Sequence, residues 1–142
     1  MSSAVDGWRG DVRTSPPWCM QNFRRLHVWE RAHQFALDVR NATHSFPRTG
    51  FGALKSQLMR AAESIPTNIV EGAGASSGKE FSRYLEISIK STFEVEYQLQ
   101  LARDYSILLP ERWESLSNEV VEIRRMLYGL RKAVLKGDRH SE

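Results

Sequence analysis

Two long stretches of the sequence repeat one spacing of apolar and small residues, alternating between steps of four and steps of three. The first contains Phe81, Leu85, Ser88, Thr92, Val95, Leu99 and Ala102. The second contains Trp113, Leu116, Val120, Ile123, Leu127, Leu130 and Val134. A sustained period of about 3.5 residues keeps one seam of a helix against its neighbour. The chain is therefore predicted to contain two long helices packed side by side.

Two further segments with helical spacing of apolar residues complete a set of four. The segments expected to be helical are 28–45, 52–71, 77–106 and 110–136. Ser77 and Glu80 have the spacing of a capping box, and Pro110 suits the first turn of a helix. Because short connections favour antiparallel neighbours, the sequence predicts an all-α fold, an antiparallel up-down-up-down four-helix bundle.

The parts of the chain outside this helical body show no sustained periodicity. Residues 1–22 contain two glycines and a Pro-Pro pair, which is typical of a flexible N-terminal arm. Residues 137–142 form a short polar C-terminal tail. The body, residues 23–136, is predicted to be one domain with its own hydrophobic core.

Composition narrows the class of protein. The single cysteine, Cys19, allows no intrachain disulfide, so a reducing cytoplasm is the expected location. The sequence lacks the run of about 18 apolar residues that a membrane span needs. The net charge of +3 is compatible with an anionic partner without requiring one.

The glycine-rich segment 72–79 invites comparison with a phosphate-binding loop, and the comparison fails in detail. That motif needs glycine five positions before Gly78, where this chain has Ala73, and a hydroxyl residue after Lys79, where it has Glu80. The segment is interpreted as a turn between two helices.

Other candidates for chemistry are equally incomplete. Glu30 and His33 have the Glu-x-x-His spacing of di-iron bundles, but no second such motif accompanies them. Cys19 has no histidine placed near it by any predicted element. No catalytic residue, metal ligand or cofactor is therefore predicted. An enzyme or metalloprotein built on Glu30 and His33 is the weakest of three hypotheses, and the other two are binding proteins.

Several stretches, taken together, resemble a known family. They are Phe23–Trp29, Phe46-Pro47, Gln57–Ile65, Asn68–Gly72 and Phe81–Leu101. In this order they are similar to the four-helix-bundle proteins encoded in intervening sequences of 23S ribosomal RNA genes. The resemblance covers about residues 23–130, and the segment 57–72 is its most specific part.

The resemblance implies a small bacterial cytoplasmic protein without known catalytic activity that forms homopentamers around a central axis. It also implies kinship with accessory proteins of diversity-generating retroelements, which associate with a reverse transcriptase and with nucleic acid. This chain departs from the family where Ala75 replaces a basic residue and where Lys90-Ser91 replaces Gly-Ser. The first departure weakens any role of that loop in binding phosphate.

Basic residues are expected to gather at one end of the bundle. From Arg124 to Lys136 the sequence holds no acidic residue, and antiparallel packing would bring the start of the body and the third helix to the same end. The candidate nucleic-acid-binding residues are Arg24, Arg25, Lys79, Arg83, Arg124, Arg125, Arg131, Lys132 and Lys136. Such a cluster would bind RNA or DNA by counterion release. Alternatively, these cations offset the helix dipole and keep the surface soluble.

Two further sets of residues concern assembly. Apolar residues outside the core seam of the third helix indicate an oligomer interface: Tyr84, Ile87, Phe93, Leu101 and Tyr105. Val121, Met126 and Tyr128 extend this set onto the fourth helix. A structural polar set, pairing within or between subunits, is expected from Arg60, Asn68, Glu71, Glu94 and Glu96.

The sequence therefore predicts a non-enzymatic homo-oligomer, a pentamer by its resemblance, that binds nucleic acid through a basic end. The alternative is a protein-binding scaffold for another polypeptide, such as a polymerase, with no direct nucleic-acid role. A partner of either kind, and the cytoplasmic location, are expectations from sequence.

Overall fold

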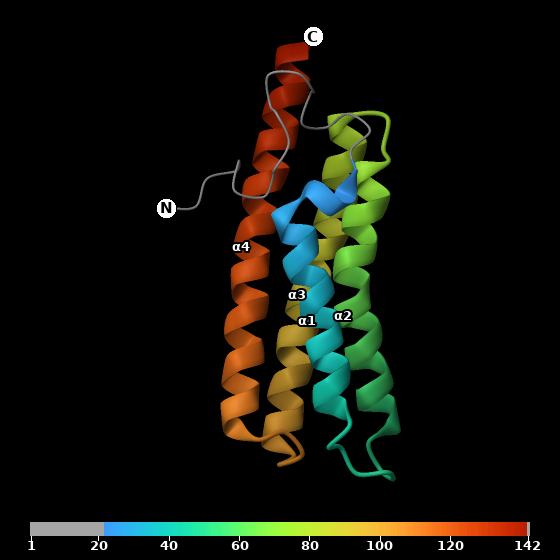
Figure 1. Ribbon diagram of the computed structural model, residues 1–142, viewed down its shortest axis with the longest axis vertical. Helices are drawn as coiled ribbons and strands as arrows, with labels where there is room; N and C mark the ends of the chain where they lie inside the picture. Colours follow the sequence, from blue (N-terminus) through green and yellow to red (C-terminus); the bar gives the residue numbers. More distant parts are fainter. Residues whose placement is uncertain (1–21, 142) are drawn as a thin grey trace.

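Four α-helices and one short 3-10 helix make up most of the computed structural model, which describes residues 22–141 (Figure 1). The 3-10 helix η2 spans Phe23–Arg25 and leads into α1, His27–Thr43. Helix α2 spans Gly52–Ala73, α3 spans Gly78–Asp104 and α4 spans Pro110–Ser141. The described residues contain no strand, which confirms the predicted all-α class.

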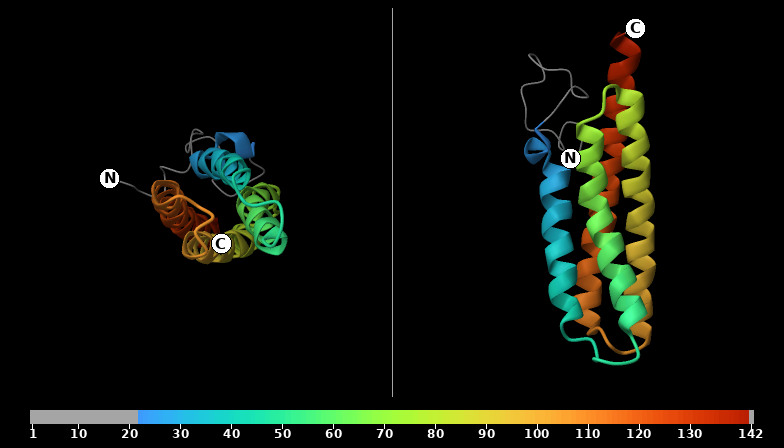
Figure 2. Two further views of the ribbon diagram at one scale, coloured as in Figure 1. Left: turned by 90° about the horizontal axis from the view of Figure 1, so that it is seen from below. Right: turned by 90° about the vertical axis from the view of Figure 1, so that its right-hand side faces the viewer.

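Successive helices run in opposite directions. Between α2 and α3, Ser88 bonds to the carbonyl of Ile65, and Gln98 contacts Gln57, so partners fall along one helix as they rise along the other. The ribbon shows the same up-down-up-down course through all four helices (Figure 1). Each helix packs against two others, and α1 and α3 occupy opposite corners of the bundle (Figure 2).

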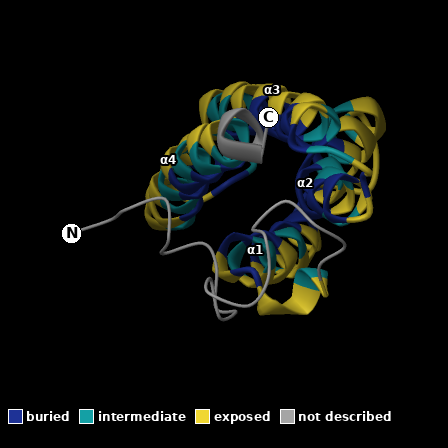
Figure 3. Cartoon of the chain, turned by 90° about the horizontal axis from the view of Figure 1, so that it is seen from above, coloured by how far each residue is buried: buried dark blue, intermediate teal, exposed yellow. Residues whose placement is uncertain are grey.

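The core lies where the four helices face one another (Figure 3). The predicted seams of α3 and α4 are buried almost throughout, and only Trp113 stays partly exposed. The largest fully buried side chains include Phe35, Leu58, Ile65, Phe81, Leu85, Leu99, Ile123 and Leu127. Met126, which the sequence suggested as a second apolar face, is also buried, because it lies toward α1.

Buried hydroxyl groups on α3 bond to backbone carbonyls. Ser88 donates to the carbonyl oxygen of Ile65 on α2 at 2.8 Å, and Thr92 donates to that of Ile89 at 2.6 Å. Burial of a hydroxyl without a partner is costly, so these bonds explain how the seam of α3 tolerates polar residues. The small side chain of Ser88 also lets α2 and α3 approach closely.

The two ends of α3 have specific caps. The Ser77 hydroxyl oxygen accepts a bond from the amide of Glu80 at 3.1 Å. The Glu80 carboxylate bonds to the amide and hydroxyl of Ser76 instead of returning to Ser77, so the predicted capping box is shifted by one residue. At the other end, Ser106 adopts a φ of 61°. The Ile107 amide then reaches the carbonyl of Ala102, which closes a Schellman turn.

Of the two predicted terminal segments, the structure describes the C-terminal one and almost none of the N-terminal one. Helix α4 continues to Ser141, through the residues expected to form a separate polar tail. A single glycine, Gly137, costs a helix only about 1 kcal/mol, and no proline follows it. The predicted arm, residues 1–22, lies outside the described residues except for Asn22. Along the described chain, none of the helices combines the length and apolar character needed to cross a membrane.

Candidate functional site

The predicted basic residues occupy two levels of the bundle. Seven of them lie on η2, on the first turns of α3 and on the last turns of α4, which share one end of the molecule (Figure 1). We call this set the basic end: Arg24, Arg25, Lys79, Arg83, Arg131, Lys132 and Lys136. The other two, Arg124 and Arg125, lie near the middle of α4.

Arg124 is held inside the seam between α3 and α4. Its Nε donates to the Thr92 hydroxyl at 2.9 Å, and it forms an ion pair with Glu96. Its guanidinium carbon lies 3.8 Å from the ring centroid of Phe93, and only 13% of its side chain is exposed. Arg124 therefore joins two helices and is poorly placed to meet a phosphate.

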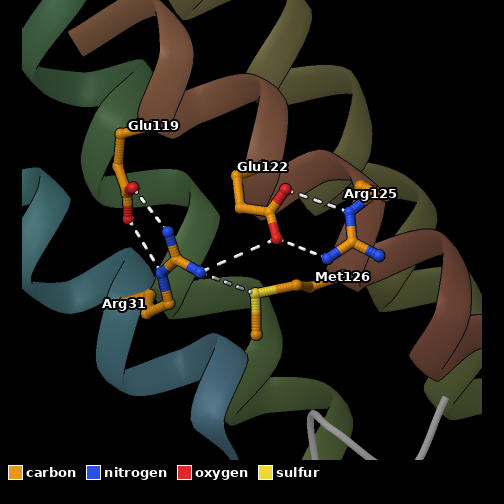
Figure 4. A network of polar contacts seen from close by, with 5 residues as sticks. All are labelled: Arg31, Glu119, Glu122, Arg125 and Met126. Atoms are coloured by element: carbon orange, nitrogen blue, oxygen red, sulfur yellow. Dashed lines mark hydrogen bonds and ion pairs between the residues drawn. The ribbon is translucent and has the colours of Figure 1, made fainter. Parts of the chain in front are cut away.

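Arg125 belongs to a polar network between α1 and α4 (Figure 4). It binds Glu122 through two nitrogen atoms, and Glu122 lies 3.8 Å from Arg31 on α1. Arg31 also donates to both carboxylate oxygens of Glu119, at 2.6 and 3.0 Å, and to the sulfur of Met126. The network ties α1 to α4.

The charges of this network shift two pKa values. The hydrogen bond from Arg125 is the main reason that the pKa of Glu122 lies below its ordinary value of 4.5. The hydrogen bond to Glu119 raises the pKa of Arg31. Both shifts favour the charged forms, as expected for ion pairs. Sequence reasoning missed Arg31, Glu119 and Glu122, although the i,i+3 spacing of Glu122 and Arg125 was visible.

Arg131 is the member of the basic end with the clearest acidic partner. Its Nη2 lies 2.5 Å from Oε1 of Glu86, so the pair connects α4 to α3. The pair is partly open to solvent, with 33% of the Arg131 side chain and 46% of the Glu86 side chain exposed. The Arg131 Nε is buried without a hydrogen-bond partner.

Three other cations of the basic end are exposed and make no ion pair with the described residues. They are Arg83 on α3 and Lys132 and Lys136 on α4. Arg24 places its guanidinium 4.5 Å from the ring centroid of Phe23. The backbone amide of Ser76, in the turn before α3, is not available to a phosphate, because it already donates to the Glu80 carboxylate. The structure thus brings together most, but not all, of the predicted cations.

The predicted interface residues on α3 differ in exposure. Ile87, Phe93 and Tyr105 are each about half exposed, whereas Tyr84 and Leu101 are partly buried. Tyr97, which the predicted interface did not include, is 64% exposed one turn after Phe93. Together with Val121 and Tyr128 of α4, both near half exposed, these residues leave large apolar groups on the outer faces of two adjacent helices. We call Phe93, Tyr97, Val121 and Tyr128 the apolar strip.

The predicted polar set has no single location. Asn68 donates to the carbonyl and hydroxyl of Ser64 one turn earlier, so it serves its own helix. Glu96 pairs with Arg124, as described above. Arg60 and Glu94 line a shallow groove of about 410 Å³ between α2 and α3. Glu71 is exposed near the end of α2.

The described residues offer little to a metal ion. His33 is exposed and stacks on Trp29 with ring centroids 5.1 Å apart. Glu30 and His33 both line a groove beside α1. Across residues 22–141, no three His, Cys, Asp or Glu side chains gather as a metal site would require. Cys19 lies outside the described residues.

Comparison with known proteins agrees with the fold. A crystal structure of a protein of unknown function from the S23 ribosomal protein family, from Bacteroides thetaiotaomicron VPI-5482, is 29% identical to this chain, with a TM-score of 0.69. The similarity covers 74% of this chain and 98% of that one. No curated protein matches. The family described as 23S rRNA-intervening sequence protein matches residues 24–129, and neither description names an enzymatic activity. The chain belongs to the family of 23S rRNA-intervening sequence proteins.

Proposed function

We propose that this protein is a non-enzymatic bundle that assembles with copies of itself, as a pentamer, and binds RNA or DNA through its basic end in the cytoplasm. The observation that carries the proposal is the exposure of Arg83, Lys132 and Lys136 at one end without ion pairs to the described residues. Closely spaced cations bind a phosphate backbone by releasing its counterions, with little reading of sequence. Several copies with their basic ends on one side would multiply the effect.

The apolar strip supports the self-assembly in this proposal. Tyr97 is 64% exposed and Phe93 51% exposed, although soluble monomers seldom leave large apolar groups clustered. The apolar strip lies on α3 and α4. Arg124 and Arg131 already join these two helices to each other, so the strip is left for another partner. Contact with another copy would remove this apolar surface from water and lower the free energy of the assembly.

The test is a fluorescence-anisotropy titration of a structured RNA and a duplex DNA at several salt concentrations. The variant Arg83→Gln/Lys132→Gln removes two exposed cations of the basic end. Its matched control, Arg48→Gln/Lys55→Gln, removes one arginine and one lysine near the other end. We expect the first variant to bind more weakly and to flatten the salt dependence for duplex DNA by about 1.8 logarithmic units per tenfold salt. The control should bind like the wild type.

Two results would oppose the proposal. Equal losses in both variants would show a general effect of net charge and no defined surface. Absence of binding by the wild type at micromolar concentration and low salt would remove the nucleic-acid role.

The alternative function is a scaffold for another polypeptide, and the exposure of the apolar strip favours it. A protein partner would then cover the strip, and an acidic one could also use the basic end. An intact assembly without affinity for nucleic acid would support this alternative.

A further inference from the structure

The pair of Glu86 and Arg131 has other basic residues near it along both helices. Glu86 lies one helical turn after Arg83 and one turn before Lys90, so it faces both along α3. Across the seam it meets Arg131, which is followed by Lys132 on α4. One carboxylate thus lies beside basic side chains of two helices, a setting that would also suit a phosphate.

The bond between Glu86 and Arg131 can be exchanged more readily than that of Arg124. Both partners are partly open to solvent, and ion pairs of this kind contribute little to stability. The Arg131 Nε has no acceptor, so the guanidinium is incompletely satisfied in its present place. Arg124, by contrast, has two polar partners and an aromatic ring around a nearly buried side chain.

We propose that Glu86 is an autoinhibitory carboxylate: it occupies Arg131, keeps this guanidinium from a backbone phosphate and so weakens the affinity of the basic end for nucleic acid. This inference rests on the function proposed above and adds its regulation. Without the carboxylate, Arg131 would bind a phosphate with no change in its own charge. The Glu86 carboxylate also repels a phosphate that approaches Arg131.

The test compares Glu86→Gln with Glu63→Gln in the full chain. Glu63 is an exposed glutamate of α2, 4.0 Å from Arg40, so its substitution changes the net charge equally away from the basic end. Binding of a duplex DNA is titrated by anisotropy between about 50 and 200 mM salt. One additional phosphate contact steepens the logarithmic salt slope by about 0.9, which makes the loss of affinity over this range about 3.5-fold larger.

We expect Glu86→Gln to bind more tightly than the wild type with this steeper slope, and Glu63→Gln to match the wild type. The double variant Glu86→Gln/Arg131→Gln should return the slope to that of the wild type. Glu86→Ala, which keeps a good helix former at this position, serves as a second variant.

The possible failures are distinguishable. Wild-type binding with no difference between Glu86→Gln and Glu63→Gln would overturn the masking role and leave the proposed function intact. Binding by Glu86→Gln, without binding by the wild type or Glu63→Gln, would show that Glu86 blocks the basic end completely. Absence of binding by every protein would overturn both proposals.

Discussion

At the scale of single residues, Gly72 shows how closely α2 and α3 approach. A Cβ atom at this position would lie 2.7 Å from Cδ1 of Phe81 and 3.1 Å from Cβ of Tyr84. Phe81 is fully buried, so its ring has no room to move aside. The sequence placed this glycine at the start of a turn between two helices, but it lies inside α2. Its function is the close contact between two helices.

This contact makes a prediction about Gly72→Ala. Overpacking of a core costs about 1–3 kcal/mol, whereas alanine gains about 1 kcal/mol over glycine within a helix. The variant should therefore have a lower free energy of unfolding, measured by urea denaturation. Gly52→Ala is the control, because a Cβ there meets nothing within 4 Å. A Gly72→Ala protein as stable as the Gly52→Ala protein would contradict the packing described here.

At the scale of helices, the sequence was most informative where apolar spacing repeats. The steps of four and three located α3 and α4, and nearly all residues at these steps are buried, because burial of one seam imposes that period. Cross-helix polar partners left no such trace. Arg131 looked unpaired along α4, yet its partner Glu86 lies on another helix, 45 residues away. Pairing of this kind depends on helix rotation and register, which the sequence does not state.

The network between α1 and α4 predicts a dependence of stability on pH. The pKa of Glu122 is lower in the folded protein than in the unfolded chain, chiefly because of the hydrogen bond from Arg125. The contribution of Glu122 is therefore complete above the unfolded pKa and is lost as the pH falls through the folded pKa. The stability difference between wild type and Glu122→Gln should shrink as the pH falls below the ordinary value of 4.5.

Denaturant unfolding of both proteins at several pH values measures this difference. In an Arg125→Gln background, the same substitution should show a weaker dependence on pH, because the main cause of the shift is gone. A difference that stays constant from neutral to strongly acidic pH would rule out the assigned role of Glu122.

At the scale of the whole molecule, the apolar strip predicts the effect of a surface charge on assembly. Tyr97→Asp places a carboxylate in the strip without entering the core, since Tyr97 is 64% exposed. A buried charge at an interface is unfavourable, so this variant should form smaller assemblies with an unchanged helical content. Leu37→Asp is the control, because Leu37 is a half-exposed apolar residue on α1. Light scattering during size-exclusion chromatography would measure both masses.

The same comparison tests the location of the interface. Equal masses for wild type, Tyr97→Asp and Leu37→Asp would mean that assembly does not use the apolar strip. A smaller mass for Leu37→Asp alone would move the interface to α1.

The polar contacts between helices differ in burial, which implies an order in which the helices separate. Helix α1 is the shortest of the four α-helices, and its polar bonds to α4 involve partly exposed arginine and glutamate side chains. The bond from α3 to α2 at Ser88 is fully buried. Backbone amides of α1 should therefore exchange with deuterium through a local opening, while those of α3 are released only by global unfolding. A transiently detached α1 would expose the inner faces of α2 and α4 as a short-lived groove for another helix.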